Sequence, residues 1–328
     1  MKEILEYLFN HHTLSKSQAK AIMIEIAQNK FNPQEVTAFI SIFLMRNITL
    51  PELEGFREAL LQMAVPVNIQ VNDAVDIVGT GGDGKNTINI STLASFVVAG
   101  AGQKVVKHGN YGASTITGSS NVLEEAGYVF KDSSEKLQED LDKANICFLH
   151  APYFHPALKS VGTLRKSLGL RTFFNLLGPL VNPAKPQFSV IGVYNLEIAR
   201  IYQYLLQKDK REFMIVHGLD GYDEISLTQD SKIITKESEE IYSAEDLGFE
   251  AVTAESITAG ASIRETAEIF RNILKGNGSN QQHSVVLANA AVALLHTQKF
   301  GTYDECLSAA RESLYSGKAF QSFEQLVK

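Results

Sequence analysis

After residue 71 the sequence alternates short apolar runs with glycine-rich turns and amphipathic stretches, and this alternation restricts the possible folds more than any other feature. A strand-like run at 74–78 is followed by a glycine-rich loop, a helical pattern from Ser91 and a second apolar run at 104–106, which together form a βαβ unit. Further strands are predicted at 146–149, 189–194 and 213–217, and helices at 135–143, 196–207, 264–274, 283–296 and 303–316. Strands separated by helices favour a mostly parallel sheet, so we predict an α/β fold.

Residues 1–66 show helical periodicity without an intervening strand. A capping-box pattern at 15–18, Asn32 before Pro33, and Pro51 mark helix starts. We therefore predict a small N-terminal all-helical domain at 1–66, joined by part of the proline-containing stretch 152–186, and a larger α/β domain at 71–328. Helices at a chain end either cover the main core or form a dimer contact, and the sequence leaves both open. Because four amphipathic helices carry more apolar surface than a small bundle buries, we expect a homodimer.

Composition and charge exclude several classes of protein. Of 328 residues, 45% are hydrophobic, which provides a sizeable core and excludes a disordered chain. The 30 Lys and Arg residues against 37 Asp and Glu give a net charge of −7, so the basic footprint of a nucleic-acid or membrane-surface protein is absent. Cys147 and Cys306 lie far apart, which argues against a disulfide scaffold. Without a secretory signal pattern or an apolar run of about 18 residues, we expect a cytoplasmic protein without a membrane partner.

The loop after the first predicted strand carries the sequence GTGGDG at 79–84. Glycines at a strand end expose backbone N–H groups, the following helix adds the positive end of its dipole, and Ser91 and Thr92 add hydroxyl groups. These features together suit a phosphate group. The alternative is a simple tight turn, since the loop matches neither of the common dinucleotide and mononucleotide glycine motifs.

Two further strand ends carry polar residues. The second strand leads into KHGNYGAST at 107–115, with GSS at 118–120. Because ligands lie at the carboxyl ends of parallel strands, we expect both loops to face one crevice, with Lys107 neutralising phosphate charge instead of being an ordinary solvated lysine. Asp223 and Glu224 follow the strand at 213–217. In a turn such acids are usually solvated, but facing a phosphate crevice they favour a Mg²⁺ site.

In order along the chain, these motifs resemble the anthranilate phosphoribosyltransferase family very closely. The similarity rests on GTGGDG at 79–84, NIST at 89–92, KHGN at 107–110, the segment from His155 through Arg165, RTFFNLLGP at 171–179, and the pair Asp223 and Glu224. It extends over nearly the whole chain. The resemblance implies the type III, nucleoside phosphorylase-like phosphoribosyltransferase fold, in which a small helical domain accompanies an α/β domain.

The same resemblance implies a pentosyltransferase of tryptophan biosynthesis. Its substrates would be 5-phosphoribosyl 1-pyrophosphate and anthranilate, its products phosphoribosyl-anthranilate and pyrophosphate, and its cofactor Mg²⁺, as a pair of ions per subunit. The positions that match phosphoribosyl pyrophosphate ligands are Gly79, Gly82, Asp83, Thr87, Asn89, Ile90, Ser91, Thr92, Lys107 and Ser119. Those that match anthranilate-site residues are Gly79, Asn110, Arg165, His108 and His155, and those that match metal ligands are Ser91, Asp223 and Glu224.

For His108 and His155, local packing or a loop hydrogen bond is the alternative to a substrate contact. No catalytic nucleophile or base is nominated, because the reaction requires neutralisation of the leaving group and positioning of an amine that is already neutral. The sequence departs from the family pattern at Tyr111, where arginine is usual, and at 120–121, where Ser-Asn replaces Ala-Asp. These departures lie in the loops that we expect to contact phosphate.

Two other functions remain as alternatives. A pyrimidine nucleoside phosphorylase would share the architecture and the phosphate loop, but the pair Asp223 and Glu224 and the segment 155–179 disfavour it. A non-catalytic relative that binds nucleic acid is opposed by the net charge of −7. The sequence therefore predicts an enzyme that acts on small molecules, with no nucleic-acid partner.

Overall fold

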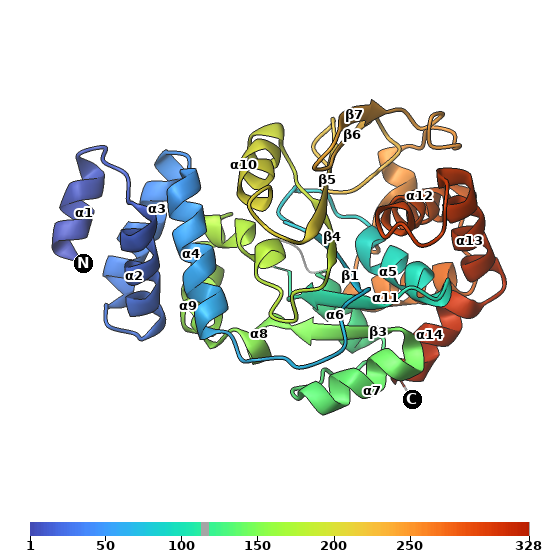
Figure 1. Cartoon of the computed structure of the whole chain (residues 1–328), viewed down its shortest axis with the longest axis horizontal. Helices are drawn as coiled ribbons and strands as arrows, with labels where there is room; N and C mark the ends of the chain where they lie inside the picture. The colour runs from blue at the N-terminus through green and yellow to red at the C-terminus, as the bar shows by residue number, and fades with distance from the viewer. Residues whose placement is uncertain (113–117, 328) are drawn as a thin grey trace.

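One seven-stranded sheet in the order β3-β2-β1-β4-β5-β6-β7 lies at the centre of the computed structural model, which describes residues 1–112 and 118–327 (Figure 1). The first five strands run parallel, and β6 and β7 add an antiparallel hairpin next to β5. The strands are β1 (Val75–Gly79), β2 (Val105–Gly109), β3 (Ile146–His150), β4 (Phe188–Gly192), β5 (Glu212–Gly218), β6 (Ser231–Ile234) and β7 (Glu239–Tyr242). The mostly parallel sheet predicted from the sequence is confirmed, whereas the β6–β7 hairpin was not predicted.

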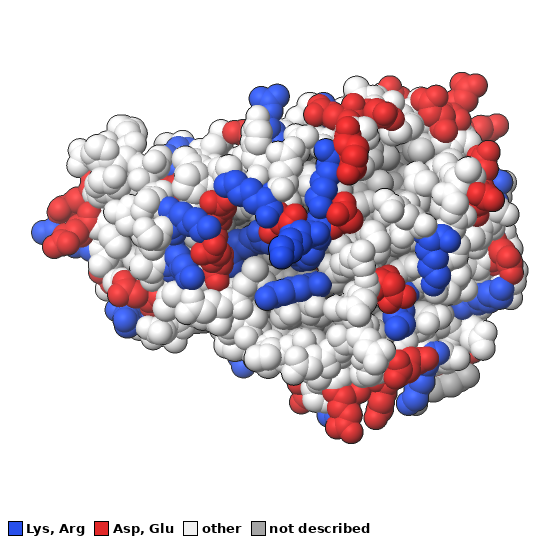
Figure 2. Space-filling model, viewed as in Figure 1, with Lys and Arg blue, Asp and Glu red and all other residues white. Residues whose placement is uncertain are grey.

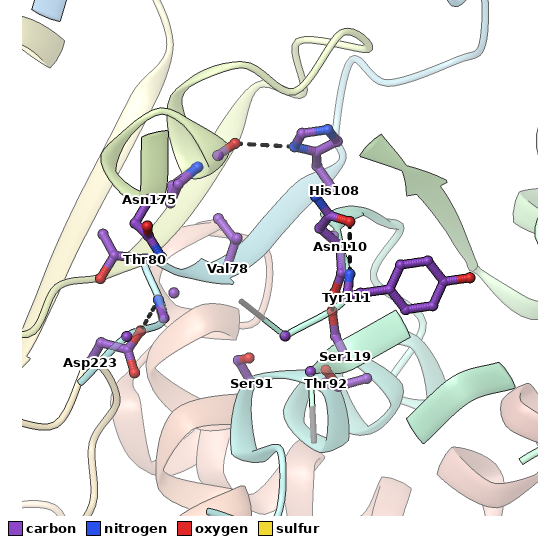
Figure 3. A pocket seen from close by; sticks show the side chains of 18 of the residues that line it. Val78, Thr80, Ser91, Thr92, His108, Asn110, Tyr111, Ser119, Asn175 and Asp223 are labelled. Atoms are coloured by element: carbon purple, nitrogen blue, oxygen red, sulfur yellow. Dashed lines mark hydrogen bonds between the residues drawn. The ribbon is translucent and has the colours of Figure 1, made fainter. Parts of the chain in front are cut away.

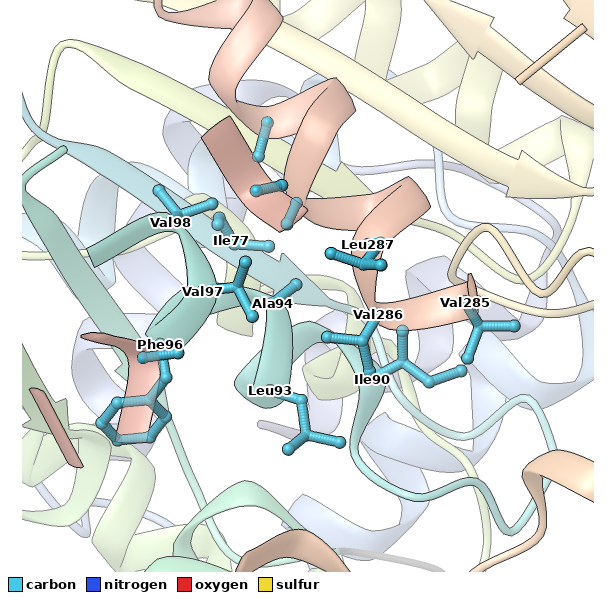
Figure 4. Packing of buried hydrophobic residues seen from close by; sticks show 14 of the residues in the cluster. Ile77, Ile90, Leu93, Ala94, Phe96, Val97, Val98, Val285, Val286 and Leu287 are labelled. Atoms are coloured by element: carbon cyan, nitrogen blue, oxygen red, sulfur yellow. The ribbon is translucent and has the colours of Figure 1, made fainter. Parts of the chain in front are cut away.

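Helices cover both faces of this sheet (Figure 1). Alternate strand residues face opposite layers, as Val105 and Val106 show by belonging to different core clusters. On one face α5 packs against α12, and Figure 4 shows Leu93 and Val97 of α5 near Val286 and Leu287 of α12. The helices of the α/β part are α5 (Ile90–Gly100), α6 (Ser119–Glu125), α7 (Ser134–Ala144), α10 (Leu196–Leu206), α11 (Ile263–Leu274), α12 (Asn280–His296), α13 (Tyr303–Tyr315) and α14 (Lys318–Val327), with the short 3₁₀ turn η3 (Ala254–Ile257).

The N-terminal segment forms four helices, namely α1 (Lys2–Phe9), α2 (Lys16–Ala27), α3 (Pro33–Met45) and α4 (Leu50–Met63). Capping boxes at Ser15 and Asn32 start α2 and α3, as the sequence predicts. The stretch between β3 and β4 returns to these helices and forms α8 (Ala151–Phe154), α9 (Pro156–Leu168), η1 (Phe173–Leu176) and η2 (Gly178–Leu180).

A cluster of phenylalanines joins the returning segment to the N-terminal helices. The ring of Phe173 in η1 lies 4.9 Å from Phe43 of α3 and 4.8 Å from Phe56 of α4, measured between ring centroids. The same hydrophobic cluster continues into Ile191 of β4 and Ile215 of β5. The N-terminal helices therefore cover part of the main core, which is one of the two roles that the sequence left open for them.

Both cysteines are buried and free, which agrees with the argument from the sequence against a disulfide scaffold. Among the helices that the structure describes, none combines the length and the apolar character that a membrane crossing requires.

Glu52 links three segments of the N-terminal helices, although it is charged and fully buried. Its carboxylate accepts hydrogen bonds from the Leu14 N–H at 3.0 Å, from both Nη atoms of Arg46 at 2.5 and 2.9 Å, and from the Thr49 N–H and hydroxyl at 2.9 and 2.8 Å. Burial raises the pKa of Glu52, but the hydrogen bonds from Arg46, Leu14 and Thr49 outweigh burial and hold the pKa below its ordinary value of 4.5.

We expect Glu52→Ala to lower the free energy of unfolding by about 3 kcal/mol, because Arg46 and two backbone N–H groups lose their partner in the interior. The pKa of Glu52 is lower in the folded state, so its stabilisation is present above 4.5 and is lost as the pH falls through the folded-state pKa. Urea unfolding of the wild type and of Glu52→Gln at neutral and at acidic pH would therefore give a smaller difference in acid.

Glu58→Ala provides a control on the same helix. Glu58 is half-exposed and pairs with Lys16 at 2.5 Å and Lys20 at 3.6 Å, so its loss would change the unfolding free energy by less than about 1 kcal/mol. Equal losses in Glu52→Ala and Glu58→Ala would contradict the role given to Glu52.

Candidate active site

A cavity of about 220 Å³ opens where the carboxyl ends of the central strands meet the returning segment. One wall consists of the loops after β1 and β2 and of the acidic pair after β5, and the other consists of α9, η1 and η2. Figure 3 shows Asp223 and His108 on opposite sides of this space, with Ser91 and Thr92 at the start of α5 below it. The strand-end loops therefore face one crevice, as expected for a parallel sheet.

Most of the residues singled out in the sequence line this cavity. They are Gly79, Gly82, Asp83, Thr87, Asn89, Ser91, Thr92, Lys107, His108, Asn110, Ser119, Arg165, Asp223 and Glu224. Ile90 and His155 are buried and do not line it. Part of the predicted phosphate loop, residues 113–115, lies outside the described residues.

Asp223 fits against the sheet only because two strands end in glycine. A Cβ atom on Gly79 or on Gly192 would overlap with atoms of Asp223, so no other residue fits at either position without a shift. The side chain of Asp223 accepts a hydrogen bond from the Gly81 N–H at 2.6 Å. Gly81 has a φ of +62°, which glycine adopts without strain. The glycine loop and the acidic pair thus form one unit although they are far apart in sequence.

Glu224, in the segment after β5, contacts the start of α5. Its Oε1 accepts a hydrogen bond from the Ser91 N–H at 2.8 Å, and its Oε2 accepts one from the Thr87 hydroxyl at 3.3 Å. Asn89 precedes the helix with a φ of +58°, which turns the chain into α5. A carboxylate at a helix N-terminus is stabilised by the helix dipole. This contact places both the acidic pair and the helix start at the cavity.

Three carboxylates lie close together in this wall. Burial raises the pKa of Asp83 to about 7 and that of Glu224 to about 8, and in both cases the charge of Asp223 adds to the effect. Burial also raises the pKa of Asp223. Such a cluster is unfavourable when all its members are ionised and no cation is present. The residues therefore fit a divalent cation, because carboxylate and hydroxyl oxygens are the ligands that Mg²⁺ prefers.

The protein alone does not complete a metal shell. In the part of the chain that the structure describes, no group of three or more His, Cys, Asp or Glu side chains is arranged to hold a metal ion. Mg²⁺ commonly binds through one or two carboxylates together with substrate phosphates and water. A cation held by Asp223, Glu224 and Ser91 would therefore need a ligand from a bound molecule.

Lys107 is buried in β2 although it is charged. Its Nζ donates a hydrogen bond to the carbonyl of Ile77 in β1. Burial lowers the pKa of Lys107 to about 8, and the charge of Asp76 opposes this shift more strongly than the charges of Glu224 and Asp223. The cavity thus has one buried cation beside its carboxylates.

Arg165 of α9 lies on the opposite wall. Its Nη2 donates to Asn175 Oδ1 at 3.4 Å, and its guanidinium lies 5.3 Å from the centre of the Phe174 ring. No Asp or Glu forms an ion pair with it among the described residues. Burial lowers its pKa from the ordinary value, since no carboxylate compensates for the loss of water. A guanidinium in this situation is suited to a carboxylate on a bound molecule.

The two histidines form a pair beside the cavity. His108 Nδ1 lies 3.1 Å from the Gly178 carbonyl, and His155 Nε2 lies 2.8 Å from the Val181 carbonyl, so each ring donates to the returning segment. Their ring centroids are 5.1 Å apart. Burial lowers the pKa of His108 to about 3 and that of His155 to about 4, so both are neutral near pH 7. His155 therefore packs against His108 without lining the cavity, as the packing alternative for this residue would have it.

Several cavity residues were not singled out from the sequence, among them Thr80, Lys85, Phe174 and Asn175. Phe174 and Asn175 belong to the motif RTFFNLLGP, whose position in the chain could have indicated them. Asp76, whose charge acts on Lys107, gave no such signal, because a single acid inside an apolar strand run matches no sequence motif.

Comparisons with known proteins agree with this geometry. Residues 71–320 match the glycosyl transferase family α/β domain, and residues 2–64 match the glycosyl transferase family helical bundle domain. The anthranilate phosphoribosyltransferase of Christiangramia forsetii is 50% identical over 328 residues, covering 100% of this chain and 99% of the relative. That of Flavobacterium johnsoniae is 51% identical over 326 residues, covering 99% and 98%.

Solved structures show the same fold. Anthranilate phosphoribosyltransferase from Thermus thermophilus superposes with a TM-score of 0.90 at 30% identity, covering 98% of each chain. The enzyme from Saccharomyces cerevisiae, in complex with PRPP and Mg, gives a TM-score of 0.88 at 26% identity, covering 96% of this chain and 93% of that one. Together with the full-length relatives, these matches show that the chain belongs to the anthranilate phosphoribosyltransferase family.

Proposed function

We propose that this chain transfers the phosphoribosyl group of 5-phosphoribosyl 1-pyrophosphate to the amine of anthranilate, giving N-(5-phosphoribosyl)anthranilate and pyrophosphate in tryptophan biosynthesis, in the cytoplasm. The observation that carries this proposal is a single cavity with two unlike walls. One wall holds exposed loop amides, buried acids and Lys107, and the other holds Arg165, which has no carboxylate partner among the described residues. The relatives named above support the same reaction.

We propose that the enzyme uses Mg²⁺ as its cofactor, with a pair of ions per subunit. Asp223 and Glu224, with the Ser91 hydroxyl, are the residues that would hold it. When bound, Mg²⁺ neutralises pyrophosphate and lowers the barrier to its departure. The yeast relative solved with PRPP and Mg supports this assignment.

On the donor side, the loop 79–84 and the start of α5 would hold the phosphates. Gly82, Asp83, Thr87, Asn89 and Thr92 line this part of the cavity, with Gly79 at the end of β1 and Ser119 at the start of α6. Lys107 places a positive charge where pyrophosphate develops negative charge as the bond to the ribose breaks. Ile90 contributes through the position of its backbone, since its side chain is in the core.

On the acceptor side, Arg165 would pair with the anthranilate carboxylate, and Asn110 would contact the same ring from the opposite loop. His108 would line the approach, with His155 behind it. The aromatic amine is neutral near pH 7 and attacks the anomeric carbon as pyrophosphate leaves, so orientation by these residues replaces a general base.

The two alternatives fit less well. A nucleoside phosphorylase would use inorganic phosphate, which gives no role to the buried pair Asp223 and Glu224 beside Lys107. On the face shown in Figure 2, Lys and Arg side chains lie among Asp and Glu. Among the ion pairs of the described residues, Lys16 and Lys208 both pair with Glu54. This surface does not offer nucleic acid a continuous basic stripe.

We also propose that the chain forms a homodimer through its helical domain. That domain would comprise residues 1–66 and part of 152–186, with 71–328 as the α/β domain. Phe9 of α1 is 60% exposed, and Leu44 and Met45 of α3 are 40% and 89% exposed. Exposed apolar side chains on α1 and α3, two helices that contact each other, favour a protein contact.

Replacing both acids, as Asp223→Asn with Glu224→Gln, is expected to abolish Mg²⁺-dependent turnover, because the cation loses its protein ligands. Turnover is followed by the loss of anthranilate fluorescence with phosphoribosyl pyrophosphate. Asp230→Asn, at an exposed position in the same part of the chain, is the control and retains activity. Unchanged metal dependence in the double variant would refute the assignment of the metal site.

Arg165→Ala is expected to raise the KM for anthranilate by roughly 10- to 100-fold, the effect of losing one charge-assisted contact. Binding of phosphoribosyl pyrophosphate with Mg²⁺, measured by calorimetry, stays close to the wild-type value. Lys166→Ala, at the neighbouring exposed position on α9, leaves both values unchanged. If both substrates weakened equally in Arg165→Ala, the acceptor site would have to lie elsewhere.

For the dimer, sedimentation of the wild type is expected to show a species of twice the chain mass of 36.1 kDa. Met45→Glu shifts this species toward the monomer, because it places a charge in the apolar contact. Ile241→Glu in β7, where the wild-type side chain is 54% exposed, is the control and sediments like the wild type. A wild-type protein that sediments only as the monomer at micromolar concentration would contradict the proposal.

A further inference from the structure

The hydrogen-bond ladder between β1 and β2 stops after its first pair. Val75 pairs with Val105, but no further pair follows along the two strands. By contrast, β1 pairs with β4 over all five residues from Val75 to Gly79, and β2 pairs with β3 over all five from Val105 to Gly109. The two strands therefore separate toward their carboxyl ends, at the cavity.

Three buried polar side chains replace the missing ladder. In a continued parallel ladder the His108 N–H would donate to the Ile77 carbonyl. Instead, the His108 N–H donates to Asp76 Oδ1 at 3.2 Å, and Lys107 Nζ donates to the Ile77 carbonyl. Asn182 Nδ2 donates to the Val106 carbonyl and to Asp76 Oδ2, both at 2.9 Å.

We name Asp76, Lys107 and Asn182 the polar wedge. All three side chains are buried, at 1%, 2% and 1% exposure. Asn182 is itself fixed, because its Oδ1 accepts a hydrogen bond from the Ala184 N–H at 3.0 Å. Buried polar groups are costly unless they are paired, so a regular apolar ladder would have been the simpler way to join these strands. Stability alone therefore does not explain why these three polar residues lie between β1 and β2.

The position of the wedge supplies that explanation. Lys107 lines the cavity, whereas Asp76 and Asn182 do not. Asp76 provides the strongest favourable charge acting on Lys107 and also holds the His108 N–H, the next residue along β2. Asp76 thus acts on the cavity through two of its wall residues without touching the space itself.

We propose that Asp76, supported by Asn182, is a positioning residue that holds β1 and β2 apart so that Lys107 faces the phosphates of the bound donor. This inference rests on the proposed function, because it takes phosphoribosyl pyrophosphate as the ligand of Lys107. The experiment below separates a failure of that function from a failure of the wedge.

The main test is calorimetric binding of phosphoribosyl pyrophosphate, with Mg²⁺ present, to the wild type and to Asp76→Asn. Asparagine keeps the shape of the side chain, but it removes the negative charge and places an N–H₂ group against another donor, either Asn182 Nδ2 or the His108 N–H. The Kd is expected to rise by about tenfold or more, as for the loss of a charge-assisted hydrogen bond. The KM for anthranilate changes by a smaller factor than the Kd for the donor, because Arg165, Phe174 and Asn175 lie on the other wall and His108 only lines the approach.

Asn182→Ala is the second variant, and it removes the support while leaving the charge of Asp76 in place. We expect it to weaken donor binding too, by a smaller factor than Asp76→Asn. This variant keeps the proposal testable if Asp76→Asn does not fold.

Gln103→Ala is the matched control for stability. Gln103 is also buried, and its Nε2 donates to the Asp73 and Lys104 carbonyls at the opposite end of the same two strands. Its replacement lowers the melting temperature but leaves the Kd for phosphoribosyl pyrophosphate unchanged.

Each outcome decides a different point. If the wild type does not bind phosphoribosyl pyrophosphate, the proposed function fails. If the wild type binds it and folded Asp76→Asn and Asn182→Ala bind it equally well, the positioning role is overturned. The same holds if Gln103→Ala weakens binding as much as the wedge variants, since stability alone would then account for the effect.

Discussion

Mutual repulsion among buried carboxylates is the constraint around which this structure is arranged. Asp223 and Glu224 are buried, Asp83 lies half-buried beside them, and burial raises the pKa of each. Such a group is held only by compensating donors, and the structure supplies backbone N–H groups from the glycine loop and from the start of α5. The glycines at the ends of β1 and β4 are also required, because any side chain there would displace Asp223. The loop sequence and the acidic pair therefore depend on each other.

The cavity needs both parts of the chain. The sheet edge presents donors and acids suited to phosphate and a metal ion, but the guanidinium suited to an aromatic carboxylate comes from another part of the chain. Arg165 comes from the segment that returns to the N-terminal helices, where Phe173 packs between α3 and α4. The position of Arg165 thus depends on the packing of the helical part against the sheet. A change in the phenylalanine cluster would therefore move the wall that carries Arg165 without altering the wall formed by the strand-end loops.

Local patterns account for what the sequence could predict. The parallel strands, the helix starts at Ser15 and Asn32, and the polar loops at strand ends depend on neighbouring residues, and the structure brings those loops together. The β6–β7 hairpin escaped prediction because β7 is largely exposed and carries Glu239 and Glu240, so it lacks an apolar run. The sequence did not indicate that His155 is buried behind His108, or that Asp76 lies where β1 separates from β2. Both arrangements arise only from tertiary packing. The roles of individual site residues remain predictions.

Two of the residues that depart from the expected pattern, Tyr111 and Ser120, contact His150, and the third, Asn121, holds the backbone of Gly112. The Tyr111 ring packs edge-on against His150 at 4.9 Å between centroids, and the Ser120 hydroxyl lies 3.0 Å from His150 Nδ1. Asn121 Oδ1 accepts a hydrogen bond from the Gly112 N–H at 2.9 Å. His150 is the last residue of β3 and is stacked on Phe130, so it provides a rigid base for the loop after β2. A guanidinium at position 111 would bring a charge to this aromatic group, whereas tyrosine adds apolar contact and frees the loop from needing a counter-ion. Contacts of Tyr111, Ser120 and Asn121 with His150 and Gly112 therefore fix the described part of the loop that carries Asn110.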